Sequence, residues 1–515
     1  LRDGVQREGL SFSLEDKLKV ARRLDGLGVH YIEGGFPGSN PRDQEFFARA
    51  AQMTWRSAKI VAFGATRYKG NRADNDPNLN AVVSAGTPVV TLVCKNSETH
   101  VREVLGVSLE ENLAMIGDSI AFLKQHGKEA IHDAEHAFDG FKQNRDYALA
   151  CLRAAHEAGA DCLVLCDTNG GTLTNDVAEI VAAVRREIPG AAIGIHTHND
   201  AELAVANTLA AVQAGAVHVQ GTINGYGERC GNANLCAIIP NLQLKLGIEC
   251  VTEDQLRSLT EVSRYVSEVA NLHPDPHMPY VGASAFAHKA GYHADAMRKN
   301  RMSYQHVDPR QIGNDERILI SELSGKAAVS SKAASLGLEL GSGDTARDIV
   351  ERVKQLEGRG YQFEGAEASF ELMVRRLQPG YKAPFELVDF LVLVETRGGK
   401  DMLAESMVKV RVEGQVLHTA GEGNGPVNAL DHALRKALAP NYPEIENIRL
   451  TDYKVRIVDE ANGTGAIPRV MIDSSDGAAT WTTVGASTNI IEASWLALAD
   501  SFEYGLTRAL TGRRK

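Results

Sequence analysis

The fold of this chain is decided by the stretch Gly194-Ile195-His196-Thr197-His198-Asn199-Asp200. Residues 193–198 read as a short β-strand that precedes an amphipathic segment. Side chains two positions apart on a strand point to the same face, so His196 and His198 project together. Two imidazoles side by side at a strand end predict half of a metal site. The alternative is a pair of polar loop residues that cap the following helix.

Short apolar runs alternate with amphipathic segments through the first 250 residues. Seven runs read as strands: 29–33, 60–63, 89–94, 130–133, 162–166, 193–198 and 217–222. Helices are expected between them, at 14–27, 109–125, 145–158, 176–187 and 234–246. The first helix opens with Ser13 and has Asp16 three residues later, as in a capping box.

Seven strand–helix repeats, with an eighth strand just before Leu1, predict an α/β fold of the (β/α)8 TIM-barrel type whose first strand is truncated. The chain does not start with Met, so we expect further residues before Leu1. A doubly wound open sheet is the alternative. It is disfavoured because no glycine-rich phosphate loop follows an early strand.

Polar residues stand where the expected strands end, which is where such barrels carry their chemistry. They are Glu33, Lys95, Asp133, Glu135, Asp167, Thr168, His196, His198 and the loop 224–232. Once the barrel closes, its last two strands neighbour the first, so four potential ligands converge: Asp3, His196, His198 and Asn232. A carboxylate, two imidazoles and an amide oxygen predict a divalent ion, Mg²⁺ or Mn²⁺, with Zn²⁺ as the alternative. Taken singly, Asp3 and Asn232 can be helix caps, and Glu33 can be a buried ion-pair partner.

The composition narrows the class of protein. A chain of 515 residues is too long for one core, so we expect two or three domains. A net charge of −11 argues against nucleic-acid and anionic-membrane partners, which need a concentrated basic face. There is no apolar run long enough to span a membrane and no visible signal peptide. Seven scattered cysteines without a CxxC pair are typical of a reducing cytoplasm, not of a zinc or disulfide framework.

The pattern changes along the chain in a way that predicts three parts. Residues 1–250 form the expected barrel, and 251–380 read as helical linker subdomains. Residues 381–515 read as an α+β domain in which a three-strand-plus-helix unit occurs twice. Glycine-rich turns at 421–425 and 485–489 precede its two helices. They can hold the carboxylate of a ligand at a helix N-terminus, or only turn the chain.

Several motifs resemble the pyruvate-carboxyltransferase-like family of metal-dependent barrels that make or break C–C bonds. They are Leu1-Arg2-Asp3-Gly4-Val5-Gln6, residues 196–200, and Gly225-Tyr226-Gly227-Glu228-Arg229-Cys230-Gly231-Asn232. Within that family, nearly the whole chain is similar to the 2-isopropylmalate, homocitrate and citramalate synthase branch. Residues 31–41 and 138–140 most resemble its citramalate-forming members.

The resemblance implies condensation of acetyl-CoA, as co-substrate, with pyruvate, followed by thioester hydrolysis. Arg2 would stabilise the developing alkoxide, and Thr168 would hold the substrate carboxylate; a strand-end hydroxyl bonded to its own backbone is the alternative for Thr168. Glu135 resembles the family's acid and would orient a base or take a proton. His293 and Tyr304 match a His and a Tyr that reach into an active site from beyond the barrel, with His288 as the competing histidine.

The same resemblance implies a homodimer whose C-terminal domain is allosteric and binds isoleucine, because citramalate is an entry to isoleucine biosynthesis. Synthesis of 2-isopropylmalate or homocitrate from another 2-oxo acid is the first alternative. A lyase of the hydroxymethylglutaryl-CoA type is disfavoured because such chains lack this C-terminal domain. A catalytically dead amino-acid sensor is a further alternative, and the intact set of expected site residues speaks against it.

Overall fold

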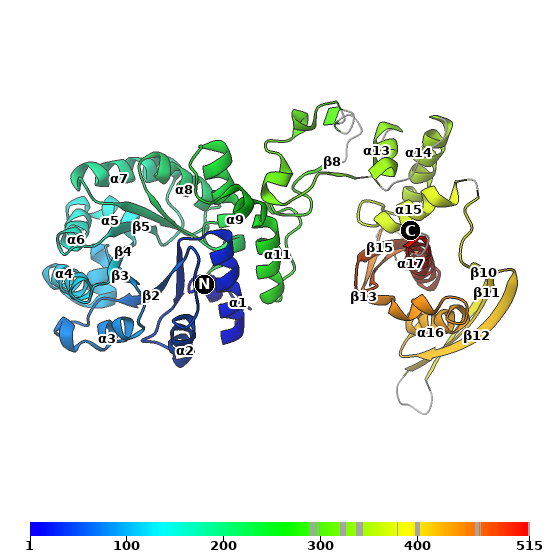
Figure 1. Ribbon diagram of the computed structural model, residues 1–515, viewed down its shortest axis with the longest axis horizontal. Coiled ribbons are helices and arrows are strands. Elements are labelled where there is room, and N and C mark those ends of the chain that lie inside the picture. Colours follow the sequence, from blue (N-terminus) through cyan, green and yellow to red (C-terminus); the bar gives the residue numbers. More distant parts are fainter. Residues whose placement is uncertain are drawn as a thin grey trace. The chain divides into compact units, whose positions relative to one another are not determined.

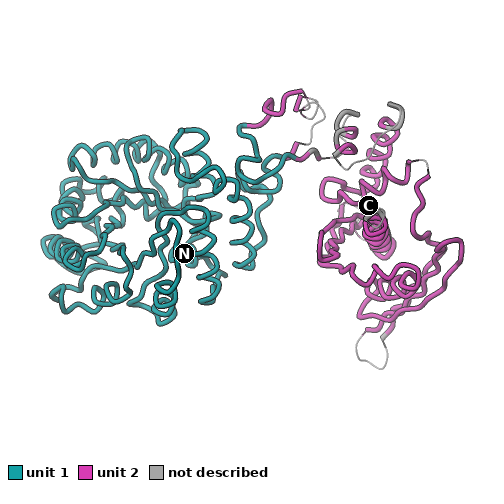
Figure 2. Tube along the Cα trace, in the orientation of Figure 1, with its two compact units in different colours: residues 1–286, 306–316 teal, residues 287–305, 317–515 magenta. Residues whose placement is uncertain are grey.

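The computed structural model describes the chain except for residues 289–292, 294, 295, 298, 320–325, 336–342, 379, 397–401, 459–462, 464 and 513–515. The chain folds into two compact units (Figure 2). Unit 1 contains residues 1–286 and 306–316, and unit 2 contains residues 287–305 and 317–515. Within the described residues, no helix combines the length and apolar character that a membrane crossing requires.

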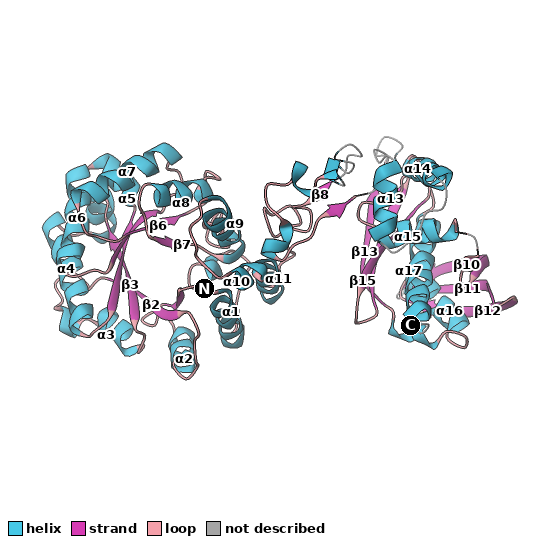
Figure 3. Ribbon diagram, turned by 45° about the horizontal axis from the view of Figure 1, so that its top comes forward, coloured by secondary structure: helices cyan, strands magenta, loops and turns pink. Residues whose placement is uncertain are grey.

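Unit 1 is built on a curled parallel sheet whose seven strands follow one another in chain order. The strands are β1 (Tyr31–Gly35), β2 (Lys59–Ala65), β3 (Val89–Lys95), β4 (Glu129–Glu135), β5 (Cys162–Asp167), β6 (Ile193–Thr197) and β7 (His218–Gln220). Helices surround this sheet (Figures 1 and 3): α1 (Leu14–Leu27), α2 (Pro41–Ala50), α3 (Pro77–Ser84), α4 (Leu109–Gln125), α5 (Ala137–Gln143), α6 (Arg145–Glu157), α7 (Thr174–Glu187), α8 (Ala204–Gln213) and α9 (Leu235–Pro240). The barrel-type α/β fold predicted from the repeats is confirmed, and the doubly wound sheet is excluded.

Alternate residues of the barrel strands belong to two separate apolar clusters. One faces the helices and includes Ala62, Val90, Leu92, Leu163, Leu165, Ile193 and Ile195. The other fills the barrel interior: Val61, Val89, Ile131, Cys162, Val164 and Cys166. Because the strand period is two, Asp133 and Glu135 share the inward face of Ile131, and His196 on β6 shares its face with His198, which directly follows the strand. The alternation of inward-facing and outward-facing residues along each strand therefore directs the polar side chains at the strand ends into the barrel mouth.

Between β1 and β7 the sheet is open. A cavity of about 760 Å³ lies there, lined on one side by residues 28–33 and on the other by residues 215–223. Arg2 and Asp3 line the same cavity and so stand at the seam of the barrel.

Local signals in the sequence explain the helix ends. The Ser13 hydroxyl accepts from the Asp16 N–H at 3.2 Å and the Asp16 carboxylate accepts from the Ser13 N–H at 3.0 Å, which confirms the capping box of α1. The helix expected over 234–246 is wrong in part. α9 ends at Pro240 and a π-helical turn, Asn241–Lys245, continues it, because proline at this position interrupts the regular ladder. Two short helices, α10 (Glu253–Arg257) and α11 (Leu259–Val269), follow.

Unit 2 begins with a two-stranded parallel pair, β8 (Ala287–His288) and β9 (Arg317–Ile318), and continues with α13 (Lys326–Ser335), α14 (Gly343–Glu357) and α15 (Glu367–Arg376). Two antiparallel sheets follow. The first has β10 (Glu386–Thr396), β11 (Met402–Val412) and β12 (Gln415–Gly423), followed by α16 (Pro426–Leu438). The second has β13 (Arg449–Ile457), β14 (Pro468–Ser475) and β15 (Thr480–Ala486), followed by α17 (Ile490–Gly512). This part of the chain therefore contains two successive units, each of three antiparallel strands followed by one helix.

Candidate metal centre and active site

Backbone hydrogen bonds hold the two loops of the site against the sheet. The Arg2 N–H donates to the Glu33 carbonyl at 3.0 Å, which fixes Asp3 beside the end of β1. Asn232 forms an isolated antiparallel bridge with His198. The Asp3 and Asn232 segments are more than two hundred residues apart in the chain, so the predicted convergence of both chain regions at one rim is observed.

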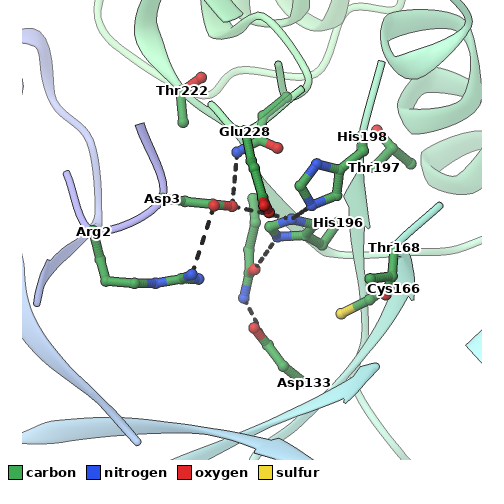
Figure 4. Close-up of polar contacts among 12 residues, drawn as sticks. Arg2, Asp3, Asp133, Cys166, Thr168, His196, Thr197, His198, Thr222 and Glu228 are labelled. Carbon is green, nitrogen blue, oxygen red and sulfur yellow. Dashed lines mark hydrogen bonds and ion pairs between the residues drawn. The ribbon is translucent and has the colours of Figure 1, made fainter. Parts of the chain in front are cut away.

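Asp3, His196, His198 and Asn232 meet as a compact, buried group, and Figure 4 shows the first three turned toward one another. The His196 Nε2 lies 3.3 Å from the Asp3 Oδ2 and 3.4 Å from the His198 Nε2. The Asn232 Nδ2 donates to the same Asp3 oxygen at 2.7 Å. Potential ligand atoms of Asp3, His196 and His198 all lie within 4.8 Å of one another, and the Asn232 Oδ1 is buried without a hydrogen-bond partner. This donor set fits a divalent ion that prefers mixed nitrogen and oxygen ligands.

The protonation of the two imidazoles differs because of Asp3. Burial lowers the pKa of His196, but the hydrogen bond and charge of Asp3 outweigh this effect and raise it to about 9. Burial and the neighbouring His196 lower the pKa of His198 to about 4. Despite its burial, Asp3 has a lowered pKa, because His196 and Arg2 stabilise its carboxylate. A proton thus bridges Asp3 and His196 where a cation can take its place, so metal binding at this position would release a proton.

Arg2 is held rigidly beside this group. Its Nε donates to the Glu33 Oε2 at 2.7 Å, its Nη1 lies 3.6 Å from the Asp3 Oδ1, and its guanidinium carbon lies 3.8 Å from the centre of the Phe63 ring. Burial lowers the pKa of Arg2, but the charges of Glu33 and Asp3 outweigh burial and raise it, so the side chain is a permanent cation. A fixed cation next to the potential metal ligands can stabilise an oxygen that gains negative charge.

Two other expected residues lie at the same end of the sheet. Glu135, at the end of β4, forms an ion pair with Lys95 at the end of β3. The Thr168 hydroxyl accepts from the backbone N–H of His136 at 2.8 Å, which leaves its own hydrogen for another acceptor. Lys95 was among the strand-end residues noted in the sequence, but nothing there indicated that it is the partner of Glu135.

His293 and Tyr304 belong to unit 2 and contact each other. Their ring centres are 4.2 Å apart at an angle of 31°. Tyr304 is 43% exposed, so unit 2 itself leaves part of this pair uncovered. The structure therefore brings the two expected base residues together within their own unit.

Sequence reasoning missed Gln220 and gave no role to Arg229. The Gln220 side chain connects His196 to Asp133, and burial, together with the Glu33 charge, raises the pKa of Asp133 to about 7. Arg229 forms a two-pronged ion pair with Asp200 and donates to the Thr168 carbonyl. A polar residue at an inward register position of β7 was the signal available for Gln220.

Three family models match successive parts of the chain. The HMGL-like model matches residues 1–266, the homocitrate synthase post-HMGL domain-like model matches 280–360, and the LeuA allosteric (dimerisation) domain matches 364–506. Together they account for the barrel, the linker and the duplicated C-terminal domain in the order found here.

Curated relatives resemble the chain over almost its full length. It is 50% identical over 511 residues to an (R)-citramalate synthase of Geobacter sulfurreducens, covering 99% of this chain and 97% of the relative. It is 52% identical to an (R)-citramalate synthase of Synechocystis, covering 99% and 95%. The identity to a 2-isopropylmalate synthase of Methanocaldococcus jannaschii is 30%, covering 100% and 94%.

Proposed function

The chain belongs to the citramalate synthase family, and from this premise we propose that its barrel mouth condenses acetyl-CoA with pyruvate and hydrolyses the thioester to citramalate and CoA. Identities of about 50% over nearly full length to (R)-citramalate synthases, against 30% to a 2-isopropylmalate synthase, favour pyruvate over larger 2-oxo acids. One observation carries the proposal for the site: the ligand atoms of Asp3, His196 and His198 cluster beside the Arg2 guanidinium.

We assign the metal ligands to Asp3, His196, His198 and Asn232, and favour Mg²⁺ or Mn²⁺ over Zn²⁺ because half of the donors are oxygens. The bound ion supplies Lewis-acid polarisation of the 2-oxo acid. Arg2 donates hydrogen bonds to the ketone oxygen as it gains charge, and its own position is held by Glu33. The Thr168 O–H donates to the substrate carboxylate while its oxygen accepts from the His136 N–H.

Removal of a proton from the acetyl-CoA methyl group requires a well-placed base, since a thioester methyl is a very weak acid. We assign this role to His293, with the Tyr304 ring packed against it at an angle as its helper. Glu135, held by Lys95, orients this machinery or receives the proton. The assignment requires His293 and Tyr304 to reach a barrel mouth, which we propose is that of a second subunit in a homodimer.

We propose that the C-terminal domain responds to isoleucine, the amino acid to which citramalate leads. Its match to a LeuA allosteric (dimerisation) domain supports both the dimer and the ligand class. Residues 424–425 connect β12 to α16, and residues 487–489 connect β15 to α17, so each expected ligand-binding segment precedes a helix N-terminus.

A substrate panel tests the function. The purified enzyme is supplied with acetyl-CoA, Mn²⁺ and pyruvate, 2-oxoisovalerate or 2-oxoglutarate, and CoA release is followed with a thiol reagent. We expect the highest kcat/KM with pyruvate and inhibition by isoleucine but not by leucine. A preference for 2-oxoisovalerate or 2-oxoglutarate would assign the chain to the isopropylmalate or homocitrate reaction, and no CoA release with any acid would indicate a sensor.

A further inference from the structure

A chain of three side chains runs through the barrel interior from β4 to the proposed metal site. The His196 Nδ1 and the Gln220 Oε1 are 2.7 Å apart, and the Gln220 Nε2 donates to the Asp133 Oδ1 at 2.9 Å. Asp133 and His196 are 3% and 8% exposed. Figure 4 shows Asp133 and His196 at the two ends of this chain, with His196 turned toward Asp3.

The chemistry of the three groups fixes the direction of both hydrogen bonds. The Asp133 Oδ1 accepts, whichever form the other carboxyl oxygen takes, so the amide must present its NH₂ to it. The Gln220 oxygen then faces His196 and can only accept, so the proton must stand on the His196 Nδ1. The Nε2 points at Asp3 and His198, and the proposed ion would take the place of the proton that Nε2 shares with Asp3.

We propose that Asp133 and Gln220 are positioning residues that hold His196 in the tautomer and ring orientation needed for metal binding through Nε2. This inference rests on the metal site in the proposed function. Neither residue touches the ion: Gln220 acts on His196, and Asp133 acts on Gln220. A histidine ligand usually donates its second N–H to an acceptor, and here that acceptor is a neutral amide whose orientation is set by a buried acid.

The arrangement predicts the outcome of exchanging donor and acceptor. Gln220→Glu places two carboxyl groups at the short Gln220–Asp133 distance and removes the donor from this contact. Asp133→Asn removes the acid that orients the amide. The double variant Gln220→Glu/Asp133→Asn restores one donor and one acceptor in each contact, because the carboxylate introduced on β7 can accept from both the imidazole and the new amide.

Mn²⁺ affinity of the metal-free full-length enzyme, measured by electron paramagnetic resonance of free Mn²⁺, is the main readout. We expect Gln220→Glu to weaken Mn²⁺ binding by about 10- to 100-fold and the double variant to recover to within about threefold of wild type. Gln52→Glu, on an exposed residue after α2, is the matched control and should bind as wild type. KM for acetyl-CoA should stay constant in all variants.

A second variant, Gln220→Leu, covers the case in which Gln220→Glu does not fold. In the Mg²⁺-loaded protein with 15N-labelled histidine, wild-type His196 should show a protonated Nδ1 and an unprotonated Nε2, and Gln220→Leu should shift toward a mixture of tautomers. Equal Mn²⁺ affinity of Gln220→Glu and wild type, or no recovery in the double variant, would overturn the inference. If wild type itself binds no Mn²⁺, the metal assignment in the proposed function fails instead.

Discussion

The side-chain oxygen of Asn232 is buried at the barrel mouth without a hydrogen-bond partner. A buried oxygen without a hydrogen bond destabilises the folded protein unless a bound ligand interacts with it. Asn232→Ala should therefore weaken Mn²⁺ binding by at least about tenfold and lower kcat/KM with pyruvate, while the fold persists. Calorimetric Mn²⁺ titration gives the affinity. Asn80→Ala on the exposed face of α3 is the control, and unchanged turnover of Asn232→Ala at limiting Mn²⁺ would contradict the assignment.

His132 is a buried histidine away from the proposed ligands. Both ring nitrogens lack a hydrogen-bond partner, and burial lowers its pKa from 6.5 to about 4. The folded chain thus binds fewer protons than the unfolded chain between pH 6.5 and 4, so this residue's contribution to stability is present at neutral pH and lost as pH falls through that window.

Unfolding of the barrel by urea tests this effect. Between about pH 7.5 and 5.5, we expect the free energy of unfolding of wild type to fall by about 1 kcal/mol more than that of His132→Leu. His132→Leu should be at least as stable as wild type at about pH 5.5, because the replaced ring makes no hydrogen bond. Parallel pH profiles for the two proteins would show that the buried imidazole is not the titrating group.

Residue types and spacing were enough to predict the group Asp3, His196, His198 and Asn232 as neighbours, because strand order in a closed barrel determines which strand ends meet. Residue types and spacing were not enough to predict which side chains contact these site residues. Lys95 pairs with Glu135 and Gln220 with His196 because particular rotamers and strand registers bring those atoms together. Such contacts depend on side-chain directions that a linear pattern does not specify.

At the scale of elements, one ion pair ties three loops of the barrel mouth together. Arg229 donates to Asp200 through its Nε at 2.7 Å and its Nη2 at 2.9 Å, and its Nη2 also reaches the Thr168 carbonyl at 2.7 Å. The loop that carries Asn232 is thereby joined to the loops after β5 and β6.

Removal of either partner should loosen this junction. We expect Arg229→Ala and Asp200→Ala each to lower kcat/KM by about tenfold, and the double variant to be little worse than either, because the two side chains act as one unit. Steady-state kinetics of wild type, the two single variants and the double variant give the coupling energy between the two side chains. Arg257→Ala, which breaks an exposed pair with Glu253, should leave kcat/KM unchanged. Additive losses in the double variant would show that the pair is not the relevant contact.

The helix boundaries show where local signals suffice. α1 and α4 match their predicted ranges because serine caps and apolar periodicity both mark them. The segment 234–246 does not, because its apolar periodicity continues through Pro240 while the backbone changes to a π-helical turn. Periodicity reports which side chains are buried, and it does not report the hydrogen-bond pattern beneath them.

At the scale of the whole molecule, ion pairs connect α15 to α17 of the C-terminal domain. Arg376 contacts Asp500 at 2.7 Å and Glu503 at 2.5 Å on α17, and the Ser369 hydroxyl donates to Asp500 at 2.7 Å. Glu367, at the other end of α15, pairs with Arg317 of β9 and Lys332 of α13. One helix therefore connects the linker elements with the helix that follows the second glycine-rich turn.

Arg376→Ala should leave two acidic side chains without their cation and, because the Arg376 side chain is 42% exposed and solvent screens the pair, destabilise unit 2 by about 1 kcal/mol. If α15 transmits the state of the C-terminal domain, the variant should also lose inhibition by isoleucine while its uninhibited kcat stays within about twofold. Differential scanning calorimetry and isoleucine titrations check the two expectations. Arg411→Ala, on an exposed pair with Glu386, is the control, and full isoleucine inhibition in Arg376→Ala would exclude transmission through this contact.

The separation of Asp3 from Asn232 along the chain, 229 residues, has a consequence for the time at which the enzyme matures. At a ribosome that adds about 5–20 residues per second, the carboxylate emerges roughly 10–50 seconds before the amide that completes its coordination set. The proposed ligand set is therefore incomplete until the loop that follows β7 has left the ribosome. We expect metal binding of full affinity only late in the synthesis of the chain.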